Sequence, residues 1–494
     1  MAFSMRLLIF ILLSLSFMLL IAQFTVSKIV QAQQQQQQQQ LQQKLQQLQQ
    51  EQQKLQQLQQ QLQQQLQQPQ QQPPLPQPKP SSPPLIKNGL PSKCVKYDNT
   101  NFMIIVSCKT ATLTDLYNQL NNRTILDKQQ PNSGVWLLNA NMTINPGATL
   151  NIDPKDTTWL KIVSDEKTLA YAIHVKGSLK IDSVTVTSWN PSTNNFAMSY
   201  GSRESSGPAT KICGSACPIE IKDQLTHKGA PRPYLIVEPR ATGTTNITNS
   251  YIGYLGYEGG WGKKAEGLHY NAGDGSVIRN NNIDHLYFGF YSVGVGNLII
   301  ENNLFHNSGH YGIDPHTGTH DMIIRNNTVF NNNGTAIICS LNCYNILYDH
   351  NKVYDNNGAG ISFSRNTTNS IARDNLIYNH EVPLEVSKSD NNLVYNNTIL
   401  NVKSTPAISL KAGTSETKVY GNKIQNTESG IFLSNATNNE VYDNLIIKTT
   451  EAGIILEEGS VKNQVQNNIV RDSPKEIEID ETSKNNILKT MNQS

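Results

Sequence analysis

The stretch LIIENNLFHNSGHYGIDPHTGTHDMIIRNNTVF, residues 298–330, contains one short pattern twice. LIIENNLF and MIIRNNTVF are apolar, β-branched runs around a pair of asparagines, and 24 residues separate their equivalent positions. A period in the twenties with strand-like content is typical of a solenoid. One asparagine of the pattern recurs in steps of 22 to 25 residues, at Asn281, Asn303, Asn327, Asn351, Asn375, Asn397, Asn422, Asn444 and Asn468.

Each repeat predicts short β-strands and no helix. Apolar runs alternate with turns rich in Asn, Gly and Ser, whereas a leucine-rich repeat would need a helical half and a Leu-x-x-Leu-x-Leu pattern. We therefore expect an all-β parallel β-helix over residues 94–490, with an inserted loop near residues 190–230. The coiling itself is expected to begin near residue 130, with earlier, less regular turns before the repeat. Asparagines stacked in register can hydrogen-bond from coil to coil.

The first 93 residues differ from the rest in composition. The apolar run that follows Arg6 fits either a cleaved signal peptide or a retained membrane anchor over residues 1–32. Residues 33–93 are a Gln tract and a Pro-rich spacer. The spacing of Leu in the tract fits either an oligomerising coiled coil or a disordered stalk. Whether residues 1–32 are a cleaved signal peptide or a retained anchor, they predict a secreted, periplasmic or cell-surface-tethered protein. Such a protein contacts a membrane only through its N-terminal segment.

The six cysteines form three local pairs along the chain, Cys94/Cys108, Cys213/Cys217 and Cys339/Cys343. In an exported protein an even number of cysteines favours disulfides, and this spacing predicts three short loops. The two C-x₃-C pairs could instead bind zinc, although no further ligand group has a familiar spacing.

Composition limits the classes of partner. The formal net charge is +2 and only 16% of residues are charged, so nothing in the overall charge indicates binding to nucleic acid or to a membrane surface. Polarity comes mainly from Asn, Gln, Ser and Thr, which suits a surface that makes hydrogen bonds.

The register of the repeats predicts which side chains face outward. One column, Ile313, Ile337, Ile361, Leu384, Ile408, Ile431 and Ile454, is apolar and should point inward, as should the column two residues later. Strand side chains alternate in direction, so Asp314 and His316 should project into solvent together, with Tyr291 beside Asp314 one coil earlier. Polar residues and a line of cations (Arg365, Lys388 and Lys411) continue this face and suit an acidic polysaccharide, although a solvated face can also simply carry lysines.

The residues Tyr311 to His316, YGIDPH, resemble the YG[FI]DPH signature of mannuronan C5-epimerases, which are right-handed parallel β-helix enzymes. The likeness covers roughly residues 130–460 and includes VTSWN near residues 185–190, FGFYS at 288–292, NNTV at 326–329 and SRN at 364–366. It implies an isomerase that removes H5 of a uronic acid and returns a proton to the opposite face of the ring. The implied substrate is a polymer like polymannuronate.

The resemblance also implies roles for single residues. His316 would be the base, Tyr311 or a water would supply the second proton, and Asp314 would orient His316 or, if protonated, bond the substrate carboxylate. Tyr311 can also be read as a corner aromatic. The family places an Arg at the position of Leu341, so in this chain either another cation, such as Arg365 or Lys263, neutralises the carboxylate or the substrate differs. The expected substrate-binding residues are Arg365, Lys388, Lys411, Arg325, Tyr291 and Lys263.

Three alternatives remain from the sequence. A polysaccharide lyase would share the first proton abstraction, and a non-catalytic carbohydrate-binding β-helix would use the face without His316. A copper or zinc site could be built from His306, His310, His316 and His320, although the four fall on a turn and a strand and should not converge. We predict no metal and no cofactor; calcium is compatible with the sequence but not indicated by it.

Overall fold

The computed structural model describes residues 93–130, 133–164, 171–198, 231–258, 265–402 and 404–489. The chain divides into two units, Met1–Gly89 and Leu90–Ser494, and the described residues all belong to the second. The predicted signal or anchor, all but the last residue of the predicted Gln-rich and Pro-rich segment, and residues 199–230 of the predicted loop lie outside them. Within these ranges no helix combines the length and apolarity that crossing a membrane requires.

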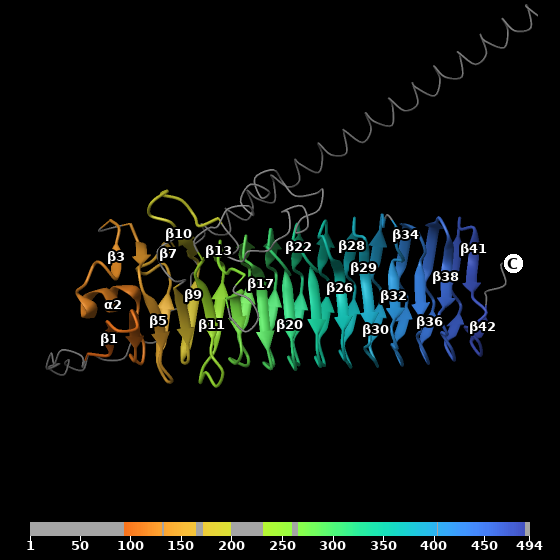
Figure 1. The fold of residues 1–494 in the computed structure, drawn as a ribbon, viewed down its shortest axis with the longest axis horizontal. Coiled ribbons are helices and arrows are strands. Elements are labelled where there is room, and N and C mark those ends of the chain that lie inside the picture. The colour runs from red at the N-terminus through yellow and green to blue at the C-terminus, as the bar shows by residue number, and fades with distance from the viewer. Residues whose placement is uncertain are drawn as a thin grey trace, which may run out of the picture. The chain divides into compact units, whose positions relative to one another are not determined.

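The described chain coils into a β-helix built of three long sheets, which we name A, B and C (Figure 1). Each regular coil contributes one strand to each sheet in turn, and consecutive coils pair in parallel, as β17 with β20 and β20 with β23. The strands of sheet A are β1 (Val95–Asp98), β2 (Met103–Val106), β5 (Asn141–Ile144), β8 (Ala172–Val175), β11 (Tyr234–Val237), β14 (Gly267–Tyr270), β17 (Phe288–Val293), β20 (Ile313–His316), β23 (Ile337–Ser340), β26 (Ala359–Ser364), β29 (Val382–Ser387), β32 (Ile408–Lys411), β35 (Ile431–Ser434), β38 (Ala452–Glu457) and β41 (Lys475–Ile479).

Sheets B and C close the other two sides of each coil. Sheet B contains β6 (Thr149–Ile152), β9 (Ser178–Asp182), β12 (Thr245–Thr248), β15 (Val277–Arg279), β18 (Ile299–Glu301), β21 (Ile323–Arg325), β24 (Leu347–Asp349), β27 (Ile371–Arg373), β30 (Leu393–Tyr395), β33 (Lys418–Tyr420), β36 (Glu440–Tyr442), β39 (Gln464–Gln466) and β42 (Ile487–Lys489). Sheet C contains β3 (Leu126–Lys128), β4 (Val135–Leu138), β7 (Trp159–Val163), β10 (Thr185–Trp189), β13 (Tyr251–Gly253), β16 (Asn282–Asp284), β19 (Leu304–His306), β22 (Thr328–Phe330), β25 (Lys352–Tyr354), β28 (Leu376–Tyr378), β31 (Thr398–Leu400), β34 (Lys423–Thr427), β37 (Leu445–Thr449) and β40 (Ile469–Arg471).

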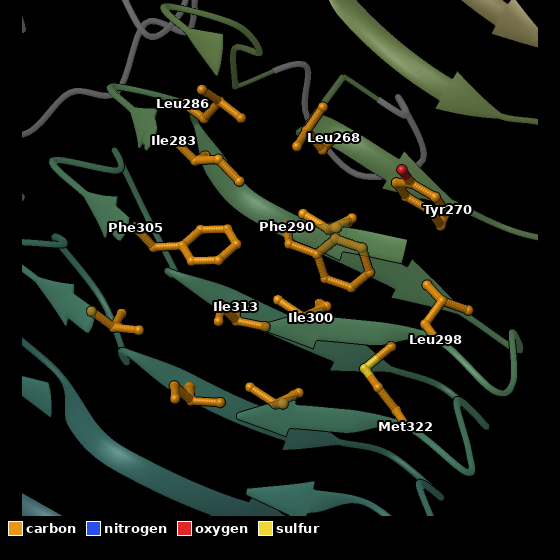
Figure 2. Packing of buried hydrophobic residues seen from close by; sticks show 14 of the residues in the cluster. Leu268, Tyr270, Ile283, Leu286, Phe290, Leu298, Ile300, Phe305, Ile313 and Met322 are labelled. Carbon is orange, nitrogen blue, oxygen red and sulfur yellow. The ribbon is translucent and has the colours of Figure 1, made fainter. Parts of the chain in front are cut away.

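The predicted inward column is confirmed by the register of sheet A. Ile313 pairs with Ile337, Ile337 with Ile361, and the pairing continues residue by residue to Ile454. Every member of the column is fully buried. Figure 2 shows Phe290, Ile300, Phe305 and Ile313 packed inside the coils. The solenoid therefore has one continuous apolar core, and the residues that alternate with this column face outward.

The predicted asparagine ladder is also confirmed, at the corner between sheets B and C. At Asn327, for example, the backbone N–H and Nδ2 both donate to Oδ1 of Asn351, at 3.0 and 3.1 Å. Its Nδ2 also donates to the carbonyl of Ile300 in the preceding coil. The same bonds recur along the column from Asn281 to Asn444, and each of its asparagines is buried. The ladder satisfies buried backbone groups that a tight corner would otherwise leave unpaired.

Coiling begins earlier than predicted. Strand β2, not a strand near residue 130, is the first to pair in parallel with later coils, through Met103 and Asn141. It also pairs antiparallel with β1, and helix α2 (Leu113–Leu120) packs on β1 and β6. The helix starts in a capping box between Thr112 and Asp115. The prediction missed this first strand because an antiparallel hairpin and a short helix accompany it instead of repeated strands.

Candidate functional site

Strand β20 places three of the predicted residues along one line. Tyr311 stands at the corner between sheets C and A just before the strand, Asp314 lies within it, and His316 ends it. Asp314 pairs with Tyr291 on β17, and His316 pairs with Val293 on β17 and Ser340 on β23. We call the outward-facing residues of these and the following strands, through Lys411 on β32, the outer face of sheet A.

Asp314 is buried, which corrects the prediction that it projects into solvent with His316. Its side chain is 1% exposed, and Oδ1 has no hydrogen-bond partner. Burial raises the pKa of this carboxyl well above its usual value, and the nearby Glu266 raises it further, while Arg365 acts in the opposite direction. Burial therefore favours the protonated, neutral form of Asp314, which can donate a hydrogen bond.

His316 is half-buried at the end of the same strand. Its Nδ1 lies 2.6 Å from Oγ1 of Thr317, and its ring centroid lies 5.5 Å from that of Tyr291. Thr317, not Asp314, is thus the residue bonded to the imidazole. Burial lowers the pKa of His316, and the charge of Arg365 lowers it further. A neutral imidazole that donates from Nδ1 keeps a free lone pair on Nε2, which is the form a general base requires.

Arg365 is the predicted cation that the structure brings to this site. It follows β26, two strands along sheet A from β20, and its side chain reaches back one coil. Nε donates to Oγ of Ser340 at 3.1 Å, and a terminal nitrogen donates to the same oxygen. The guanidinium lowers the pKa of Asp314, His316 and Tyr311 alike.

Aromatic rings and a second histidine surround the three residues. The ring of Tyr311 contacts those of Phe288 and His310, with centroids 5.4 and 4.0 Å apart. On the other side, the ring centroids of Tyr291 and His269 lie 4.9 Å apart, and Nδ1 of His269 lies 2.5 Å from Oε2 of Glu266. Sequence reasoning missed Glu266 and His269, because they precede the regular repeat; the one available signal was the alignment of β14 with β17.

The remaining predicted cations contribute less than expected. Lys388 is exposed at the corner one coil beyond Arg365. Lys411 forms an ion pair with Glu385, at 2.7 Å, so its charge is compensated. The prediction for Arg325 was wrong: it lies on β21 of sheet B, where it shares Glu301 with Arg279. Lys263 lies outside the described residues.

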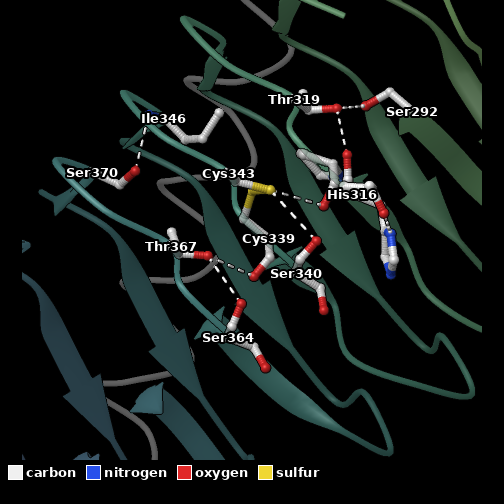
Figure 3. The surroundings of a disulfide bond; sticks show 12 residues. Ser292, His316, Thr319, Cys339, Ser340, Cys343, Ile346, Ser364, Thr367 and Ser370 are labelled. Carbon is white, nitrogen blue, oxygen red and sulfur yellow. Dashed lines mark hydrogen bonds between the residues drawn. A yellow bond between two sulfur atoms is a disulfide. The ribbon is translucent and has the colours of Figure 1, made fainter. Parts of the chain in front are cut away.

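Two of the three predicted disulfides are present, Cys94–Cys108 and Cys339–Cys343. The second lies at the corner that follows β23, close to Ser340 and His316 (Figure 3). It excludes the zinc interpretation for Cys339 and Cys343, since a disulfide offers no thiolate. Cys213 and Cys217 lie outside the described residues.

The four histidines considered as a metal site each have separate neighbours. His306 faces Asp284 on sheet C, His310 stacks on Phe288, and His320 lies 2.7 Å from Asp321. Within the described ranges, three potential ligand atoms come within 4.8 Å of one another at Asp349, His350 and Asp374. Asp349 there is already bonded to His350 and to Arg373, at 2.7 and 3.0 Å. This cluster therefore gives no indication of a metal.

A surface depression of about 560 Å³ lies elsewhere, at the corner between sheets C and A. Its lining includes Thr427, Glu428, Lys448 and Asp472, four to six coils beyond β20. None of the predicted site residues lines it. We therefore locate the candidate site from its chemistry, on the open outer face of sheet A.

The burial of Asp314 predicts how Asp314→Asn changes stability with pH. In the wild-type protein the folded-state pKa is raised above the unfolded value of 3.8, so the folded protein loses stability as pH rises from about 4 toward that folded pKa. The linkage slope for one such group is about 1.4 kcal/mol per pH unit. Asp314→Asn removes this loss. Denaturant unfolding should show the free energy of unfolding of the variant increasing relative to that of wild type as pH rises from 4 to 8. A difference between the two proteins that stays constant over this range would contradict a raised pKa of Asp314.

Comparisons with known proteins agree with the fold. The periplasmic alginate epimerase AlgG is 19% identical, with a TM-score of 0.54 over 76% of this chain and 85% of that one, which shows a shared fold alone. The A-module of the mannuronan C-5 epimerase AlgE6 of Azotobacter vinelandii is 12% identical over 73% of this chain and 90% of that one, and its TM-score of 0.44 is too low to carry an argument. No curated protein matches the sequence.

A family model gives a more direct assignment. The model described as "Right handed beta helix region" matches residues 237–399 and 383–491. Together these matches span residues 237–491, just over half of the 494-residue chain. They coincide with the coils that carry the asparagine ladder and the candidate site, and on this basis the chain belongs to the right-handed β-helix family.

Proposed function

We propose that this protein is a C5-epimerase that acts on a uronic-acid polysaccharide. The observation that carries the proposal is the arrangement along β20: Tyr311 and His316 stand at its two ends, and the buried Asp314 lies between them. Epimerisation needs a base on one side of a sugar ring and an acid on the other. A sugar lying over Asp314 would have one such group on each side.

The first task of the site is to neutralise the substrate carboxylate, because a proton next to a carboxylate anion is very weakly acidic. Arg365 would supply a positive charge, and Asp314 would donate its acidic proton to a carboxylate oxygen. The Oδ1 of Asp314 has no hydrogen-bond partner to give up, but it is buried, so a substrate oxygen reaches it only when neighbouring side chains move. Both interactions strengthen as negative charge builds up on the carboxylate oxygens.

The second task is the proton exchange itself. His316 takes H5 on Nε2, and the electron pair of the C5–H bond moves into the neutralised carboxylate. Tyr311 then gives its phenol proton to C5 from the other side, which inverts the configuration and leaves a phenolate. Burial, and to a smaller extent Asp314, raise the pKa of Tyr311, and the charge of Arg365 acts in the opposite direction and so favours that step.

The name of one structural neighbour favours the same substrate class. AlgG is an alginate epimerase, and we propose a polymannuronate-like substrate here on the strength of the YGIDPH resemblance. The outer face of sheet A continues through Ser340, Ser364 and Lys388, so it could hold an extended acidic chain. We also propose export to an oxidising compartment, which two disulfides support.

The test is proton NMR of polymannuronate and of polygalacturonate after incubation with the full chain. New signals of the C5-inverted sugar, without unsaturated ends, support the epimerase. Unsaturated product absorbing in the ultraviolet would identify a lyase, which shares the first step. Binding of a polyuronate without any change in it would identify a carbohydrate-binding protein and overturn the proposal.

The shifted pKa values of His316 and Asp314 predict a bell-shaped pH dependence of kcat/KM. His316 must be neutral, and its lowered pKa places the acid limb below pH 6.5. Asp314 must be protonated, and its raised pKa places the alkaline limb above the range of an ordinary carboxyl. Rates measured from pH 4 to 10 check this. An acid limb centred above pH 6.5 would contradict His316 as the base.

A further inference from the structure

Arg365 approaches the site from an unusual distance. It stands at the corner two coils beyond the strand that carries Asp314, and the equivalent corner one coil nearer holds Leu341. Strands in a sheet are about 4.8 Å apart, so the guanidinium must extend over a whole intervening strand. A long exposed side chain samples many rotamers unless an acceptor fixes it.

Ser340 is placed to be that acceptor. It ends β23, pairing with His316 on one side and with Ser364, the neighbour of Arg365, on the other. Its side chain is only 1% exposed, and its hydroxyl oxygen accepts from two nitrogens of Arg365. Ser340 thus lies next to the imidazole of His316. Its strand, β23, runs between β26, which Arg365 follows, and β20, which carries Asp314 and His316.

The corner that carries Ser340 is closed covalently. In the neighbouring coils a threonine hydroxyl closes this corner: Thr319 donates to the carbonyl of His316 at 2.8 Å, and Thr367 donates to the carbonyl of Ser364 at 3.2 Å. Cys343 takes that position beside Ser340 and is bonded instead to Cys339 (Figure 3). The disulfide therefore closes a short loop that contains Ser340 and constrains the backbone that carries it.

The hydroxyl of Ser340 that accepts from Arg365 is also electrically neutral. Lys411 is paired with Glu385 and Arg325 with Glu301, so a carboxylate compensates each of those cations. Across the described ranges, Arg365 forms no ion pair within 4.0 Å. A hydroxyl can hold a guanidinium and leave its full charge available to an anion, whereas a carboxylate would cancel it.

We propose that Ser340 is a positioning residue that holds the guanidinium of Arg365 over Asp314 and His316. Arg365 begins two coils away and in this way supplies the positive charge that the nearer corner, at Leu341, lacks. This inference rests on the proposed function for its role in catalysis. The placement itself can be measured without any turnover.

The test is an NMR titration of the His316 ring in the full chain. Ser340→Ala frees the guanidinium, so the pKa of His316 should rise, in the same direction as in Arg365→Gln. Ser340→Thr keeps the hydroxyl and should leave the pKa unchanged, and Ser340→Asp should raise it by cancelling the charge of Arg365. Ser364→Ala is the matched control one coil further on and should leave it unchanged. Thermal unfolding of each variant checks that the coil is intact.

Activity gives the second readout. Loss of one hydrogen bond to a charged group should lower kcat/KM of Ser340→Ala about tenfold to a hundredfold, with Ser340→Thr largely restored. An unchanged His316 pKa in Ser340→Ala overturns the inference, whether or not Arg365→Gln shifts it. A shifted pKa in a protein that converts no polyuronate upholds the placement and overturns only the proposed function.

Discussion

Replacing His316 with alanine should lower epimerisation of a polyuronate by about 10²–10⁴-fold, the usual contribution of a general base. The loss should fall on kcat, because the imidazole acts on H5 and the other groups that hold the carboxylate remain. His316 is half-buried at a strand end, so its removal should leave the fold intact. Proton NMR of the product measures the rate, and polymer binding measured separately should change little.

His320→Ala is the matched control for this prediction. His320 is four residues further on, where its ring stacks on Tyr344 and its Nδ1 lies 2.7 Å from Asp321, away from the candidate site. It should retain activity near that of wild type. Equal activity in the two variants would mean that His316 is not the base.

The core and the corners of this fold can be predicted from the sequence because each leaves a periodic trace. The inward column from Ile313 to Ile454 and the ladder of Asn281 to Asn468 recur once per coil, so register follows from alignment of the repeats. The start of the coiling leaves no such trace. Strand β2 joins sheet A through a hairpin and a short helix, where local pairing replaces the repeat.

The candidate site is less predictable because its environment comes from other coils. Alternation along β20 correctly places Asp314 on the outer side, in the column of Tyr291, but its burial depends on side chains from other segments. Its pKa likewise depends on Glu266, which precedes the regular repeat, and on Arg365, two coils away. No pattern within YGIDPH contains that information.

Arg325 shows the opposite case, an error that the repeat itself could have prevented. MIIRNNTVF aligns with LIIENNLF, so Arg325 occupies the column of Glu301 on sheet B. Only eleven residues separate Arg325 from Asp314, yet in a coil of about 24 residues that distance leads onto another side of the solenoid. In this fold proximity in sequence is a poor guide to a shared face, and the column is a better one.

Asn351→Ala should lower the free energy of unfolding by about 2–6 kcal/mol, since it leaves at least two buried polar groups unpaired at about 1–3 kcal/mol each. The side chain of Asn351 is 1% exposed. It accepts from the backbone N–H and Nδ2 of Asn327, at 3.0 and 3.1 Å. It donates to the carbonyl of Ile324 at 2.9 Å and to Asn375 at 3.1 Å. Denaturant unfolding measures the loss.

Asn444→Ala removes an equivalent set of bonds far from the site, because Asn444 is fully buried and bonded in the same way to Asn422, Val419 and Asn468. Asn351 lies in the coil that begins with β23, which carries Ser340, whereas Asn444 lies four coils further on. Coils of a solenoid contact only their neighbours, so loosening spreads over a short range. The two variants should therefore lose similar stability, but only Asn351→Ala should lose activity well below its melting temperature. Equal loss of activity in both would show that the site depends on the whole solenoid rather than on the coils that build it.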